Sequence, residues 1–100
     1  MTTEQRYKRH KDLAAELNEI YIAKNKDYGN SFGDIFQELG IITAITRMSD
    51  KLNRLKSLAK KPEAERKVKN ESIIDTLKDL ANYALMTIIE LEVQKENEKL

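Results

Sequence analysis

The chain has 100 residues, a length that fits one domain, and 40% of them are hydrophobic, which is enough for a globular core. Its 18 basic and 17 acidic residues are interleaved, and the net charge of +1 argues against binding to duplex nucleic acid, which favours a basic excess. The lack of cysteine excludes disulfides and thiolate metal sites. The polar first residues and the lack of a long apolar run predict neither a signal peptide nor a membrane span, so we expect a cytoplasmic protein.

A first long helix is predicted over residues 3–25. A content of 35% charged residues with three glycines and one proline is typical of long helices rather than strands. Thr2 or Thr3 can cap this helix. Its only histidine, His10, is interpreted as a residue at the core edge rather than as a catalytic group or metal ligand. The apolar stripe at helical spacing consists of His10, Leu13, Ala14, Leu17, Ile20 and Tyr21.

The next segment, K-D-Y-G-N-S-F-G, is predicted to be a loop over residues 26–33, because its two glycines can adopt positive φ and break the helix. A short helical turn is predicted over 34–39, and Gly40 ends it. We expect Phe36 and Leu39 of this turn to dock on the core. The loop carries more charged and aromatic side chains than a simple turn requires, which makes it a candidate wall of a binding site.

Two further long helices are predicted over residues 42–60 and 70–96, with Asn70 as the N-cap of the last. Between them, residues 61–69 are charged and carry the only proline, which predicts an exposed linker. Three long helices with a short helical turn predict an all-α helical bundle. The last helix is apolar over more of its circumference than two partners would cover, which predicts a homo-oligomer. Its apolar residues are Ile73, Ile74, Leu77, Leu80, Ala81, Ala84, Leu85, Ile88 and Leu91.

The last helix also carries an acidic stripe on the side away from its apolar residues. A helical turn of 100° per residue brings together Glu71, Asp75, Asp79 and Asn82. A solvated face is the ordinary interpretation of such a stripe. However, acids four residues apart repel one another, and almost no lysine accompanies these. A cation or a basic partner would therefore stabilise this face.

The polar side of the 42–60 helix carries Arg47, Asp50 and Arg54. Local ion pairs from Asp50 to the two arginines are one interpretation. The other is a phosphate site, since the planar fork of arginine suits phosphate and can stack on a base. Carboxylates on neighbouring helices can hold Mg²⁺, which often shares its oxygen ligands with phosphates. The two polar faces together are thus compatible with a nucleotide site.

Three segments carry a resemblance to a known family: KNKDYGNSF, SDKLNRLKSL and ESIIDTLKDLANYAL. In this order, over about residues 20–90, they resemble the nucleotide modification associated domain 1 family. Those are small helical proteins common in bacteriophages and prophages of Gram-positive bacteria. The resemblance implies the cytoplasm of a bacterial host as the compartment and a link to nucleotide metabolism. It suggests functional positions at Lys26, Asp27, Tyr28, Gly29, Asp50, Lys51, Arg54, Glu71, Asp75, Asp79, Asn82 and Tyr83.

The pattern is also similar, more distantly, to the all-α nucleoside triphosphate pyrophosphohydrolases (MazG-like). Those proteins hold Mg²⁺ with helix-borne acids in ExxE and ExxD motifs and cleave between the α and β phosphates. Here Glu16 and Glu19 form an ExxE, but they lie mostly off the apolar stripe of the first helix. The last helix has its acids at four-residue steps and no ExxD among them. This departure from the motifs argues against catalysis more than against nucleotide binding.

The sequence therefore predicts a phage-type nucleotide-binding protein, with Mg²⁺-dependent nucleotide pyrophosphohydrolysis as the enzymatic version. The alternatives are a non-catalytic protein that sequesters a nucleotide of host immune signalling, and a protein-binding inhibitor of a host factor. Tyr83 is the candidate to stack on a base. The acids predicted to hold the metal are Asp50, Glu71, Asp75 and Asp79. The residues predicted to bind the nucleotide are Lys26, Asp27, Tyr28, Arg47, Lys51, Arg54, Asn82 and Tyr83.

Overall fold

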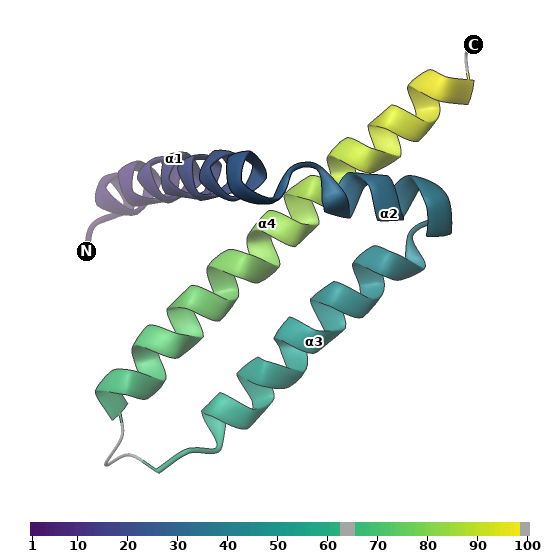
Figure 1. Cartoon of the computed structure of the whole chain (residues 1–100). Coiled ribbons are helices and arrows are strands. Elements are labelled where there is room, and N and C mark those ends of the chain that lie inside the picture. The colour runs from purple at the N-terminus through teal and green to yellow at the C-terminus, as the bar shows by residue number, and fades with distance from the viewer. Residues whose placement is uncertain (63–65, 99–100) are drawn as a thin grey trace. The chain divides into compact units, whose positions relative to one another are not determined.

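A computed structural model describes residues 1–62 and 66–98, and this part of the chain contains helices and no strand. The predicted all-α helical architecture is confirmed. The chain divides into two compact units, Met1–Asn30 and Ser31–Leu100, and each is described by itself. No helix within the described ranges is long and apolar enough to cross a membrane. The helices are α1 (Thr3–Tyr28), α2 (Ser31–Leu39), α3 (Ile42–Ala59) and α4 (Arg66–Glu98) (Figure 1).

The first unit consists of α1, which begins at a capping box. The Thr2 side chain accepts a hydrogen bond from the Gln5 backbone N–H at 3.1 Å, and the Gln5 side chain accepts from the Thr2 N–H at 2.8 Å. The helix ends at Gly29, whose φ of 69° suits glycine and whose N–H donates to the Asn25 carbonyl at 2.7 Å. This corrects the predicted loop over 26–33. Lys26–Tyr28 are helical because the first residue that breaks the helix is Gly29.

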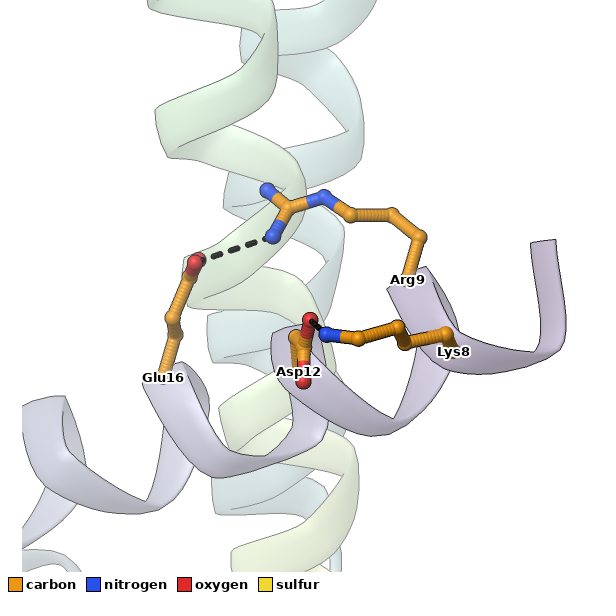
Figure 2. Close-up of polar contacts among 4 residues, drawn as sticks. All are labelled: Lys8, Arg9, Asp12 and Glu16. Carbon is orange, nitrogen blue, oxygen red and sulfur yellow. Dashed lines mark hydrogen bonds and ion pairs between the residues drawn. The ribbon is translucent and has the colours of Figure 1, made fainter. Parts of the chain in front are cut away.

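The surface of α1 carries two ion pairs, which Figure 2 shows along one side of the helix. Lys8 and Asp12 are 2.9 Å apart, and Arg9 and Glu16 are 3.0 Å apart. All four side chains are substantially exposed, so each pair contributes about 0–1 kcal/mol at most. No residue of α1 is buried, and His10 is exposed rather than at a core edge.

The second unit begins with α2, which occupies most of the predicted loop. Only Gly29 and Asn30 separate it from α1. Gly33 lies inside α2 and is buried, whereas Gly40 ends the helix as predicted, with φ of 83°. Phe36 is fully buried, also as predicted, but Leu39 is 62% exposed and does not dock on the core.

The helices α3 and α4 run antiparallel, and α2 lies at the end of the pair where α3 begins (Figure 1). Apolar residues alone do not fill the core of this unit. Its buried apolar side chains are Phe36, Ala44 and Leu58, and its buried polar ones are Thr76, Thr87 and Glu90. The fully buried side chains of α4 are therefore polar, whereas its apolar residues Ile73, Leu80 and Met86 are half-buried.

Each buried polar side chain of α4 has a hydrogen-bond partner. The hydroxyl of Thr76 donates to the Ser72 carbonyl at 2.7 Å, and that of Thr87 donates to the Tyr83 carbonyl at 2.6 Å. Gln37 of α2 donates through Nε2 to the carbonyl and the Oε1 of Glu90, both at 3.1 Å. Because a buried polar group costs free energy only when it lacks a partner, these bonds allow the polar side of α4 to lie inward.

Much of the wide apolar face of α4 therefore lies outside the core of this unit, although Ile73, Leu80 and Ala81 are half-buried. Ile74, Leu77 and Ile88 are 51%, 48% and 53% exposed. The helix also begins before the predicted N-cap Asn70. Residues 66–69 belong to α4 because lysine and arginine are good helix formers. Of the predicted linker over 61–69, residues 63–65 lie outside the described residues.

Phe36→Ala should lower the free energy of unfolding by about 3–5 kcal/mol, because it empties a fully buried aromatic site. Leu39→Ala, in the same helix but 62% exposed, is the matched control and should change it by about 0.5 kcal/mol or less. Urea unfolding followed by circular dichroism, at one fixed protein concentration, measures both. Equal losses for the two variants would contradict the described packing of α2.

Candidate functional site

Two cations of α3, Lys51 and Arg54, contact polar side chains of α4. We call the cations and their partners Thr76 and Asp79 the polar seam. Lys51 Nζ is 3.3 Å from Asp79 Oδ2, and the two side chains are 29% and 33% exposed. Arg54 donates through Nε to Thr76 Oγ1 at 3.2 Å. Thr76, 2% exposed, donates its own hydroxyl hydrogen bond to the Ser72 carbonyl. The seam therefore holds an ammonium and a guanidinium one helical turn apart.

An aromatic pair lies one helical turn further along α4. The rings of Phe32 and Tyr83 have centroids 5.6 Å apart at 54°, and Phe32 also meets Phe36 at 6.1 Å. The antiparallel register of the seam, continued by one turn, brings Arg47 of α3 to the level of Tyr83. A row of three cations on α3 thus runs from the seam toward aromatic side chains.

The acids predicted to hold a metal are not gathered together. Asp79 lies in the polar seam, while Asp50, Glu71 and Asp75 are exposed on their helices. Asn82 is half-buried on α4. Within the described residues, no group of three or more His, Cys, Asp or Glu side chains is placed to hold a metal ion.

Mg²⁺ does not always require a cage made of protein ligands alone. It is commonly bound by one or two carboxylates together with the phosphate oxygens of a substrate. The four-residue step between Asp75 and Asp79 places both carboxylates on one side of α4, so these residues fit such a shared site. The predicted Mg²⁺ stays a prediction, and Asp75 and Asp79 are the residues that would hold it together with phosphate oxygens.

The sequence profile that matches this chain covers residues 24–91, and its description is nucleotide modification associated domain 1. The chain belongs to the nucleotide modification associated domain 1 family. Searches of curated proteins and of solved structures returned no match. The family description links the chain to nucleotide modification in general terms, and the polar seam lies inside the matched range.

The matched range also includes the end of α1, with three residues predicted to bind ligand. Lys26, Asp27 and Tyr28 form the last turn of that helix and are exposed, Tyr28 by 76%. They belong to the unit Met1–Asn30, whereas the polar seam belongs to the unit Ser31–Leu100. Their part in a family ligand site stays a prediction.

Sequence reasoning missed two contacts of this region. It did not identify Thr76 as the acceptor for Arg54. It left Phe32 in a loop, whereas the first turn of α2 brings this ring onto Tyr83. Both contacts join residues more than twenty positions apart, and periodicity within one helix carries no signal for them.

Thr76→Val should lower the free energy of unfolding by about 1 kcal/mol, because the buried hydroxyl that accepts from Arg54 is lost. Thr46→Val is a matched control, since the Thr46 hydroxyl donates to its own helix at the Ile42 carbonyl but is exposed. That control should change the free energy by about 0.5 kcal/mol or less. Chemical unfolding compares them, and an equal effect would count against a structural role for the seam.

Proposed function

We propose that this member of the nucleotide modification associated domain 1 family binds a nucleotide along the polar seam of α3 and α4. The observation that carries the proposal is the pair of cations held one turn apart, Lys51 against Asp79 and Arg54 against Thr76. Phosphate groups are the ligands that such a pair suits, because lysine supplies a compact charge and arginine a planar fork.

The contacts of Arg54 and Lys51 support a site in which both cationic side chains are already positioned before a ligand binds. Arg54 uses Nε toward Thr76, which orients the guanidinium while its terminal nitrogens form the edge that pairs with two phosphate oxygens. Lys51 is held at the surface of the helix pair by Asp79. Side chains ordered in this way lose less conformational entropy when they bind.

The aromatic pair Phe32–Tyr83 is the proposed contact for the base. Tyr83 follows Asp79 by four residues, which corresponds to about 6 Å along the helix axis. A nucleotide with its phosphates at Lys51 and Arg54 would extend in this direction toward Tyr83. Stacking on an aromatic ring recognises every base to a similar degree, and each stacked base contributes about 1–3 kcal/mol.

Binding, rather than turnover, is the function that the geometry supports best. The described residues hold no group of three acids suited to a metal, and Asp79 is already paired with Lys51. Mg²⁺ would accompany the nucleotide and supply charge neutralisation between the phosphates and the acids of α4. Sequestration of a nucleotide requires no more than this. Hydrolysis to a monophosphate and pyrophosphate would be a further property of the same site.

Calorimetry with a panel of ribo- and deoxyribonucleoside triphosphates, with and without Mg²⁺, should reveal binding by the natural chain. Arg54→Ala and Lys51→Ala should each weaken it about tenfold or more, because a charge-assisted hydrogen bond contributes about 1.5–3 kcal/mol. Thr76 still donates to the Ser72 carbonyl in Arg54→Ala, so the helix pair should remain folded.

Lys56→Ala is the matched control, because Lys56 is exposed on α3 about 160° around the helix from Arg54. It should bind as the natural chain does. A panel without any binding, or an Arg54→Ala variant that binds unchanged, would contradict the proposed site. Lys26→Ala tests separately whether the last turn of α1 takes part. Analysis of the calorimetry samples for monophosphate and pyrophosphate decides between sequestration and hydrolysis.

A further inference from the structure

The exposed side of α4 carries an apolar stripe with the spacing of a coiled-coil seam. Successive members are three and four residues apart in alternation, the pattern of heptad positions a and d. Between Ile73 and Leu91, no charged residue lies within about 60° of the stripe's centre on the helical wheel. The members of the apolar stripe are Ile74, Leu77, Ala81, Ala84, Ile88 and Leu91.

This stripe is separate from the side of α4 that meets α3. On the helical wheel, Ile88 lies about 180° from Asp79 of the polar seam. The large members Ile74, Leu77, Ile88 and Leu91 are 51%, 48%, 53% and 42% exposed. A surface of this kind is unfavourable in water unless another apolar surface covers it.

The stripe is symmetric in side-chain size about its midpoint. It reads large, large, small, small, large, large from either end. An antiparallel second copy, aligned on this midpoint, would set Ala81 against Ala84 of the partner subunit. It would likewise set Leu77 against Ile88 of the partner subunit and Ile74 against Leu91 of the partner subunit. Every contact layer then joins side chains of matching size, and the two central alanine layers let the helices approach closely.

The charges beside the stripe favour the same arrangement. Lys78 and Glu92 flank it on one side, at the heptad position e. In an antiparallel pair, Lys78 faces Glu92 of the partner subunit at both ends. Leu85, which is 49% exposed, lies between them near the two-fold axis. A parallel pair would instead place Lys78 beside Ile73 of the partner subunit and forgo the opposite charge.

The extent of the apolar surface is suited to a second copy of the chain. The four large members of the stripe and Leu85 are each 42–53% exposed, and they lie along about 25 Å of one helix, a length that the same helix of a second copy can cover completely.

We propose that two copies of this chain associate through the apolar stripe of α4 in an antiparallel pair with a two-fold axis between Ala81 and Ala84. The interface is isologous, so the same residues bind on both copies and the assembly closes as a dimer. The polar seam lies on the other side of α4 and stays accessible. The inference is independent of the proposed nucleotide site.

Light scattering of the full chain should give twice the 11.6 kDa mass of one copy. Ala84→Glu places a charge at the centre of the stripe and should give 11.6 kDa while the helical circular dichroism is retained. Ile42→Glu is the control, because Ile42 is 62% exposed on α3 and outside the stripe, and it should remain dimeric. A monomeric natural chain, or an Ala84→Glu variant of unchanged mass, would overturn the proposal.

Disulfide trapping tests the antiparallel direction, since the chain has no cysteine of its own. The double variant Ile74→Cys/Leu91→Cys should form a covalent dimer under oxidation. The two positions are about 25 Å apart on one helix, so they cannot bond within a chain. Each single variant should stay monomeric on a non-reducing gel. A covalent dimer from Ile74→Cys alone would indicate a parallel pair and overturn the antiparallel arrangement.

Discussion

The packing of the threonine side of α4 against α3 is the constraint on which the rest of the structure depends. Thr76, which accepts a hydrogen bond from Arg54 of α3, and Thr87 are both buried, and each hydroxyl donates to a carbonyl of its own helix. Short side chains without an unmet hydrogen bond fill such an interface at little cost in free energy. The consequence is an inversion of the usual hydropathy pattern, in which the most apolar side of a helix faces the core of its own chain.

This inversion connects the two proposals while keeping them on different surfaces. Turning the polar side of α4 toward α3 brings Asp79 to Lys51 and Thr76 to Arg54, which orders two cations beside acids and an aromatic pair. The same rotation turns Ile88 and its neighbours to the outside. The proposed nucleotide site and the proposed interface between two copies thus lie on different faces of one helix.

Local patterns were sufficient for much of the fold. The capping box at Thr2 and the positive φ of Gly29 and Gly40 follow from residue chemistry over a few positions, although the predicted end of α1 at residue 25 is three residues too early. The sequence could not predict which side of α4 meets α3. Periodicity shows which residues share a face of a helix, but it does not show which element packs against that face. For the same reason the sequence identified Lys51, Arg54 and Asp79 as candidates but not the contacts that Lys51 and Arg54 make with α4.

The central claim is that the apolar stripe of α4 faces outward and binds a second copy. Its most direct test is an isotope-filtered nuclear Overhauser experiment on an equal mixture of labelled and unlabelled chains. Contacts between methyl groups of different copies report only the interface, whereas contacts within one copy are filtered out. We expect intermolecular signals that join Leu77 with Ile88 and Ile74 with Leu91, and none from Leu58, which is buried inside one chain. Intermolecular signals from Leu58, or their complete absence from the apolar stripe, would contradict it.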